Sequence, residues 1–433
     1  MPSTKDERRL AKVVTFFLNA SRHSLVVNTF SYTINFGLQL VIQLGFFMLI
    51  SRTLGAEGYG VFVTITSVSV IAVILIGVGS EYLLVHRVAV DPQLFPVYFG
   101  HALIMMAVTF PLVAIPTVVV LRQIVGDAIG LLPLVVIILT DLIFTRLNVL
   151  AAQAYMAFDR ANKQLAINVM MMLSKLGFLA VAAFFGGLTV STWAWWYFAA
   201  GALSASVAVA MVLRDLGRPV FTIVRKDLGL ASLYCLEFLS VGSMKDLDKP
   251  VIMHTLGAEA GGQYAAGFRI VDAASAPVRA FLYATYTRHF RHAAGGRNSS
   301  LAFGVKLLPI AVGLALPVAA GLFIIADYIP RVLGADFNGT PEIVKALAFY
   351  PLLMGLSGIG ADLLRALGHQ RVRMALLIIS SLALVPVVWI GIGYGGLVGA
   401  AYFRLILQTA LTLLTWMTIL LFKPQPRSDV SNR

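Results

Sequence analysis

The chain has 433 residues, of which 59% are hydrophobic and only 12% are charged, and its mean hydropathy is +0.87. A soluble chain carries about twice that share of charged residues, so the composition excludes a soluble protein and indicates a polytopic membrane protein. The formal net charge of +13 does not indicate nucleic-acid binding, because the basic residues lie in short gaps between apolar runs and form no clustered face.

The N-terminal segment, residues 1–24, is charged and leads into a long apolar run without a small-residue cleavage site. We therefore expect a retained first helix rather than a signal peptide. Cys235 is the single cysteine, which argues against a disulfide framework and against a cysteine metal site.

Twelve apolar windows are each long enough to cross a bilayer as a helix, which takes about 20 residues. In chain order the first six are 25–51, 61–85, 97–121, 129–155, 164–185 and 192–213. The second six are 228–253, 264–287, 301–326, 342–367, 374–392 and 397–422. The window 228–253 is the least clear, because its second half is charged. No window remains for a soluble domain, so we predict an all-α integral membrane protein.

The polar turn between the first two windows nearly repeats later in the chain. The segment Thr-Leu-Gly-Ala-Glu at 53–57 recurs at 255–259, an offset of 202 positions (255 minus 53), again between two hydrophobic segments. A repeat at this spacing indicates two similar halves of a membrane protein.

Lys and Arg residues concentrate in every second connection, and the opposite side has little more than Arg52, Arg122 and Arg331. By the positive-inside rule both termini are cytoplasmic, and the alternation persists through all twelve windows. We predict two six-helix lobes related by a pseudo-two-fold axis along the membrane normal. The predicted parts are a cytoplasmic segment 1–24, an N-lobe 25–213, a cytoplasmic linker 214–227, a C-lobe 228–422 and a cytoplasmic tail 423–433.

The first window carries a single polar stripe that includes Asn35, Gln39 and Gln43. At about 100° per residue the stripe is roughly 80° wide, which is too polar a face to meet lipid. Two interpretations stay open: hydrogen bonding between helices inside the bundle, and the wall of an aqueous cavity.

The eighth window carries Arg269, Asp272 and Arg279, whose spacings place them on one helical face. The seventh carries five charged residues before Pro250, which is expected to kink or end the helix. There Glu237 and Asp248 share a face with Lys245 beside them, Asp246 points the other way, and Lys249 follows.

Inserting an ionised group into the membrane at a helix centre costs about 2.5–3.5 kcal/mol on insertion scales, so these groups must be ion-paired or hydrated. One interpretation is structural pairing, for example of Asp272 with Arg269, or of Arg365 near Asp362. Where cations lie deep in the membrane and outnumber the nearby acids, we instead predict a cationic cavity that binds an anionic substrate. The residues predicted to form it are Arg269, Arg279, Lys245 and Arg404. An enzyme is not expected, because no His-Glu-x-x-His, nucleotide-binding glycine loop or nucleophile elbow is present.

Four segments carry a resemblance to a known family: RTLGAEGYGVF at 52–62, QYAAGFRI at 263–270, RVLGADF at 331–337 and YGGLVGAA at 394–401. With these segments in this order, the whole chain resembles the Wzx-type polysaccharide and O-antigen flippases of the multidrug/oligosaccharidyl-lipid/polysaccharide (MOP) exporter superfamily. The resemblance implies two six-helix lobes around a cavity that opens alternately to the two membrane faces. It also implies transport of undecaprenyl-diphosphate-linked oligosaccharide across the bacterial inner membrane for surface polysaccharide biosynthesis.

The resemblance further implies coupling to an H⁺ or Na⁺ gradient and no cofactor. The acids considered for coupling are Asp272, Glu237, Asp248 and Asp141, and the polar walls for a glycan would include Asn35, Gln39 and Gln43. A polysaccharide polymerase and glycosyltransferases are the partners to consider. Three alternatives stay open: a cation-coupled drug exporter, whose first span commonly holds an acid that is absent here; a lipid II flippase, which has two further helices; and a non-transporting scaffold of a polysaccharide assembly complex.

Overall fold

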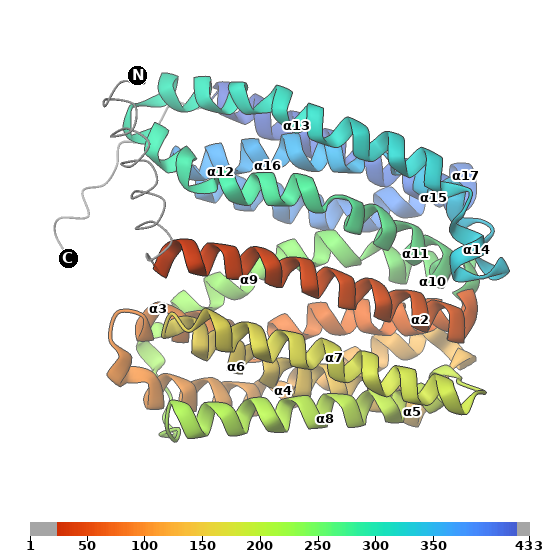
Figure 1. Cartoon of the computed structure of the whole chain (residues 1–433), viewed down its shortest axis with the longest axis horizontal. Coiled ribbons are helices and arrows are strands. Elements are labelled where there is room, and N and C mark those ends of the chain that lie inside the picture. The colour runs from red at the N-terminus through yellow and green to blue at the C-terminus, as the bar shows by residue number, and fades with distance from the viewer. Residues whose placement is uncertain (1–23, 422–433) are drawn as a thin grey trace, which may run out of the picture.

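The computed structural model describes residues 24–421, with side chains from Gly37 onward, and this part of the chain is helical without a strand (Figure 1). The first half contains α2 (Ser24–Leu75), α3 (Ser80–Val88), α4 (Phe95–Val125), α5 (Leu131–Leu139), α6 (Arg146–Ala157), α7 (Ala161–Phe185) and α8 (Val190–Asp215). The second half contains α9 (Leu228–Asp246), α10 (Asp248–Leu256), α11 (Ala258–Ala274), α12 (Ala276–Ala294), α13 (Arg297–Ala326), α14 (Ile329–Leu333), α15 (Thr340–Ala346), α16 (Tyr350–Ala366) and α17 (Gln370–Leu421). Apart from Ser24, the predicted segments 1–24 and 423–433 lie outside the described residues.

The two longest helices each contain a chain reversal. In α2, Gly55 has φ 67° and ψ −179°, a conformation that only glycine adopts readily, and the rings of Phe47 and Tyr59 on its two sides lie 5.7 Å apart. In α17 the reversal falls at Gly395 and Gly396. Each of these helices therefore supplies two antiparallel segments, as predicted from the sequence.

Seven described helices are long and apolar enough to cross a membrane, or eight with the bent pair that ends in α16. Two of the seven, α2 and α17, are the helices that fold back and so supply two segments each. The two predicted windows that remain, 228–253 and 264–287, correspond to α9–α10 and α11–α12, which are broken and carry charged side chains. All twelve predicted windows thus coincide with helical segments of the described chain.

The repeated turns meet where the two lobes come closest. A Cβ atom on Gly60 of α2 would lie 1.9 Å from the carbonyl oxygen of Ala258, and one on Gly262 of α11 would lie 1.9 Å from the carbonyl oxygen of Ala56. Gly60 and Gly262, like Ala56 and Ala258, are 202 positions apart, so the two contacts are related by the repeat. Gly257, the counterpart of Gly55, has φ 91° and ψ 173°. The crossing confirms the predicted two-fold relation between the lobes.

We call the end of the bundle that holds this crossing the turn end, and the opposite end the linker end, because residues 216–227 connect the lobes there (Figure 1). At the linker end Asp227 accepts a hydrogen bond from Tyr98 and pairs with Arg87 at 2.5 Å. Burial alone would raise the pKa of Asp227, but the hydrogen bond and the ion pair outweigh it and hold the pKa below its ordinary value.

The second segment of α2 ends in a sharp break before α3. Gly77, Val78 and Gly79 all have positive φ, and a Cβ atom on Gly79 would lie 2.2 Å from the carbonyl oxygen of Ala231 in α9. Beyond the break, Tyr82 stacks on Phe238 of α9 with ring centroids 3.9 Å apart. The lobes therefore also touch along the α2–α9 side, and the break allows α3 to follow α9 closely.

Candidate functional site

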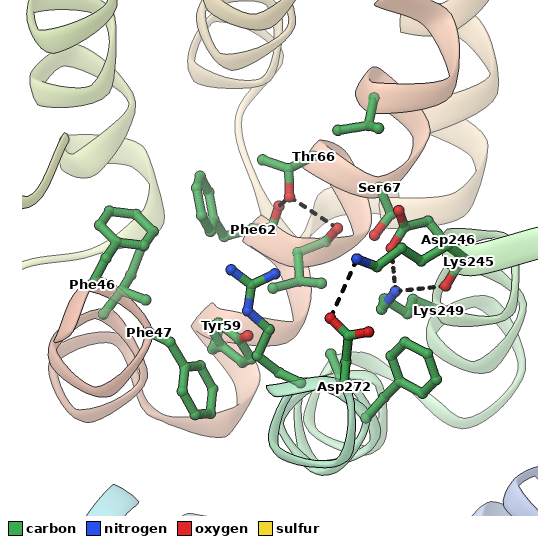
Figure 2. Close-up of a pocket in the computed structure, with 16 residues that line it drawn as sticks. Phe46, Phe47, Tyr59, Phe62, Thr66, Ser67, Lys245, Asp246, Lys249 and Asp272 are labelled. Atoms are coloured by element: carbon green, nitrogen blue, oxygen red, sulfur yellow. Dashed lines mark hydrogen bonds and ion pairs between the residues drawn. The ribbon is translucent and has the colours of Figure 1, made fainter. Parts of the chain in front are cut away.

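A cavity of about 190 Å³ lies between the lobes, next to the glycine crossing. Aromatic and small side chains of α2 form one wall, and charged side chains of α9, α10 and α11 form the other (Figure 2). The lining residues are Phe46, Phe47, Ile50, Tyr59, Phe62, Val63, Thr66, Ser67, Val70, Lys245, Asp246, Lys249, Ala265, Phe268, Arg269 and Asp272. We call this space the central cavity.

A second cavity of about 350 Å³ is lined by residues of the C-lobe. Lys245 and Asp272 line both spaces, and Arg279, Arg373 and Gln408 are among the polar residues of the second one. Pockets for small ligands usually measure about 300–1,000 Å³, so the second cavity falls in this range and the central cavity is smaller. Of the predicted cationic residues, three line these two cavities: Arg269, Arg279 and Lys245.

Asp272 joins two of these cations. Its Oδ2 lies 3.3 Å from Nζ of Lys245, and its Oδ1 accepts a hydrogen bond from Arg279 at 2.7 Å. The side chains of Lys245, Arg279 and Asp272 are 49%, 24% and 17% exposed, so the group is open to the cavity. The pairing of Asp272 with Arg269 that the sequence suggested is replaced by these two contacts.

Arg269 lines the central cavity without a carboxylate partner among the described residues. Its guanidinium donates one long hydrogen bond, of 3.5 Å, to Oε1 of Gln43 on α2. Gln43 in turn donates toward Sδ of Met172 at 3.9 Å, so this member of the polar stripe lies between helices. Gln39 is half-buried, and the side chain of Asn35 lies outside the described residues.

Lys249 and Asp246 were not predicted as site residues, yet both line the central cavity and pair with each other. The prediction that Asp246 points away from Glu237 and Asp248 agrees with the structure, because those two acids pair with arginines of α17 while Asp246 faces the cavity. The sequence could not show that this face of α9 is the one that lines the cavity, because periodicity does not identify the partner of a helical face.

Arg404 does not line the cavity, which corrects its prediction as a substrate contact. Its side chain is 1% exposed and pairs with Asp248, whose side chain has no exposed surface. Tyr264 donates a second hydrogen bond to Asp248 at 2.7 Å, and Arg404 stacks over the ring of Phe268. The prediction that Arg404 has no acid to pair with was therefore wrong. Its partner Asp248 lies on a different helix and meets Arg404 only in the folded bundle.

The other two predicted coupling acids do not line the central cavity. Glu237 pairs with Arg373 and Arg365 in the C-lobe. Asp141 is 3% exposed and lies in a π-helical turn, Thr140–Thr145, where Tyr197 donates to it at 2.6 Å. Of the four acids, Asp272 alone combines cavity exposure with contacts to predicted substrate cations. Within residues 24–421 no group of three or more His, Cys, Asp or Glu is placed to hold a metal ion.

Positions related by the 202-residue repeat line the central cavity from both lobes. Ser67 of α2 corresponds to Arg269, and Val70 corresponds to Asp272. Phe47 likewise corresponds to Lys249. The backbone is thus repeated while the chemistry is not: the N-lobe contributes an apolar and hydroxyl wall, and the C-lobe contributes the charges.

The sequence model of the family described as "Polysaccharide biosynthesis protein" matches residues 25–286, more than half of the chain. No curated protein matches the chain significantly. Among solved structures, the inward-facing conformation of a multidrug resistance MATE family transporter of the MOP superfamily is similar with a TM-score of 0.74 at 15% identity, over 88% of this chain and 93% of that one.

The outward-facing conformation of a multidrug resistance MATE family transporter gives a TM-score of 0.63 at 16% identity, over 89% of this chain and 92% of that one. The lipid II flippase MurJ in an inward closed conformation gives 0.69 at 12% identity, over 90% and 87% of the two chains. At these identities the likeness shows a common fold, in agreement with the fold expected from the sequence.

Proposed function

Because the chain belongs to the polysaccharide biosynthesis protein family and has the fold of MOP-superfamily transporters, we propose that it flips lipid-linked oligosaccharide across the bacterial inner membrane. The substrate would be an undecaprenyl-diphosphate-linked repeat unit for surface polysaccharide such as O-antigen or exopolysaccharide. The observation that carries the proposal is the set of cations that line the central and second cavities, among them Lys245, Arg269 and Arg279.

The charge of this set suits a diphosphate. Among the described residues five cations line the two cavities, Lys245, Lys249, Arg269, Arg279 and Arg373, against two carboxylates, Asp246 and Asp272. Guanidinium groups bind phosphate oxygens in charge-assisted and often bidentate hydrogen bonds, and an ammonium adds a point charge. A head group with two negative charges would therefore be stabilised here, while the lipid tail stays in the bilayer and the glycan meets polar groups such as Gln408.

The membrane orientation follows from the basic connections, which would place both termini and the linker end in the cytoplasm. The turn end is closed by the glycine crossing. The TM-score with an inward-facing transporter, 0.74, exceeds that with an outward-facing one, 0.63. Both observations support assigning the structure to an inward-facing state of an alternating-access cycle.

For the coupling ion, H⁺ or Na⁺, Asp272 is the acid that we favour, because a cation bound there would change the charge beside the substrate cations. As partners we propose a polysaccharide polymerase and glycosyltransferases.

A drug exporter is the second candidate for the function, supported by the structural similarity to a multidrug transporter. However, cations outnumber acids among the residues that line the two cavities, which disfavours the binding of cationic drugs. A non-transporting scaffold of a polysaccharide assembly complex would need no cavity at all.

The test is complementation of a strain that lacks its own flippase, with wild type, Arg269→Ala and Arg279→Ala at matched membrane expression. Arg122→Ala is the control, since Arg122 pairs with the exposed Asp127 at the turn end, away from the cavity. We expect wild type and the control to restore surface glycan and the two cavity variants to fail. Restoration by both cavity variants would overturn the assignment of these arginines, and failure of wild type with several glycans would favour the drug exporter.

A further inference from the structure

The carboxylate of Asp272 occupies the position where an anionic ligand would bind. Each of its oxygens meets a different cation, Lys245 from α9 and Arg279 from α12, at 3.3 and 2.7 Å. Lys245 and Asp272 line the central cavity and the second cavity alike. Figure 2 shows their ion pair in the central cavity. A phosphate between the same two cations would present its oxygens in the same manner.

Exposure separates this group from the structural ion pair nearby. Arg404 and Asp248 are 1% and 0% exposed, so no ligand can compete for them. Lys245 is 49% exposed and can exchange Asp272 for an anion that enters the cavity. Partly exposed pairs of this kind are weak, and a competing anion with more charge can displace the carboxylate.

We propose that Asp272 is an internal counter-anion that holds the site of a substrate phosphate in the empty transporter and is displaced when the head group binds. The inference rests on the proposed function, because it takes the diphosphate as the competing anion. Without Asp272, Lys245 and Arg279 would face each other unpaired within the bundle, which is unfavourable at this depth.

Displacement also gives selectivity. A ligand with a single negative charge replaces Asp272 without a gain in charge. A diphosphate adds a second negative charge and reaches Arg269, which lies one helical turn before Asp272 on α11 and has no carboxylate partner among the described residues. Asp272 therefore lowers the affinity of the site for anions, and small monoanions of the cytoplasm are excluded by competition with its carboxylate rather than by the shape of the cavity.

Binding of farnesyl diphosphate, a short prenyl diphosphate, to the full-length purified protein in lipid nanodiscs tests the inference by calorimetry. Asp272→Asn should bind the probe tighter by about five- to twentyfold, which corresponds to the loss of two partly exposed ion pairs that compete with it. The gain should disappear when Lys245→Gln and Arg279→Gln are added. Asp272→Ser, a smaller neutral variant, should give the same gain and serves if the asparagine variant does not fold.

Asp246→Asn is the matched control, because it removes the same charge from the same cavity. The cation that loses its carboxylate partner is then Lys249, whose side chain is 7% exposed and stays 4.0 Å from Asp248. We expect it to change the affinity by less than about twofold. An equal gain in both asparagine variants would show a general charge effect and overturn the inference, as would unchanged or weaker binding by both Asp272 variants. If wild type and all variants fail to bind the probe, the proposed function fails as well.

Discussion

The glycine crossing at the turn end makes a quantitative prediction about alternating access. Replacing Gly60 with alanine puts a Cβ atom 1.9 Å from the carbonyl oxygen of Ala258, where carbon and oxygen normally stay about 3.3 Å apart. The segments must therefore separate by roughly 1.4 Å, a distance that small side-chain shifts cannot supply because the contact is with backbone. Gly262→Ala creates the same conflict with Ala56.

Overpacking of this kind costs about 1–3 kcal/mol, and about 1.4 kcal/mol changes an equilibrium tenfold. The conflict exists only while the turn end is closed, so each substitution should shift the population toward the outward-facing state by about five- to 150-fold. The two effects should be less than additive, because the separation that relieves one contact relieves the other.

Spin-label distances between residues 57 and 259 provide the assay, since Glu57 and Glu259 are exposed at corresponding positions of the two turns. The cysteine pair is placed in a Cys235→Ser background, where serine can keep the hydrogen bond to Ile74. We expect a longer distance in Gly60→Ala and Gly262→Ala than in wild type. Gly313→Ala is the control, because nothing lies within 4 Å of its Cβ atom. Unchanged distances in both crossing variants, with protein that is folded, would refute the reasoning.

Two further predictions concern stability. Arg404→Ala removes the closer of the two cations beside the buried Asp248, since Lys249 stays 4.0 Å away, and should lower the free energy of unfolding in detergent by about 3–5 kcal/mol. Arg269→Ala breaks no ion pair in the described chain and should lower it by less than about 1 kcal/mol, so equal losses would contradict this reasoning. The depressed pKa of Asp227 means that its stabilising contribution is present above the unfolded-state pKa, about 3.9, and is lost as the pH falls through the folded-state value. The difference in melting temperature between wild type and Asp227→Asn should therefore be largest near neutral pH and shrink below about pH 4, and a constant difference would exclude this cause.

The architecture was predictable because it depends on properties that are local in sequence. Apolar length decides which segments can cross a bilayer, and the alternation of basic connections fixes their number. The repeat at 53–57 and 255–259 marked two equivalent turns, and a conformation like that of Gly55 requires glycine at both places. What the repeat could not reveal was that the two turns touch each other.

The charges inside the membrane were only partly predictable, because their partners lie on other helices. Lys245, Arg269 and Arg279 line the cavities, and their role as substrate contacts stays a prediction, whereas Arg404 is paired with Asp248 across 156 positions of sequence. Periodicity identifies the face of one helix and says nothing of which face of another helix meets it. It therefore could not show that the face of α9 with Lys245 and Asp246 is the one that lines the cavity.

The contrast between a repeated backbone and an unrepeated set of charges bears on how such a transporter can move its substrate. The lobes contact each other at the turn end through backbone at Gly60 and Gly262, which leaves few side chains to rearrange when they separate. The charges lie on the C-lobe, opposite Phe47 and Val70 of the N-lobe. A head group bound to the C-lobe cations can therefore keep its ion pairs while the apolar wall moves past it. If the cations were divided between the lobes, each half-cycle would have to break a charge-assisted contact within the membrane, which adds several kcal/mol to the barrier at about 1.5–3 kcal/mol for each contact.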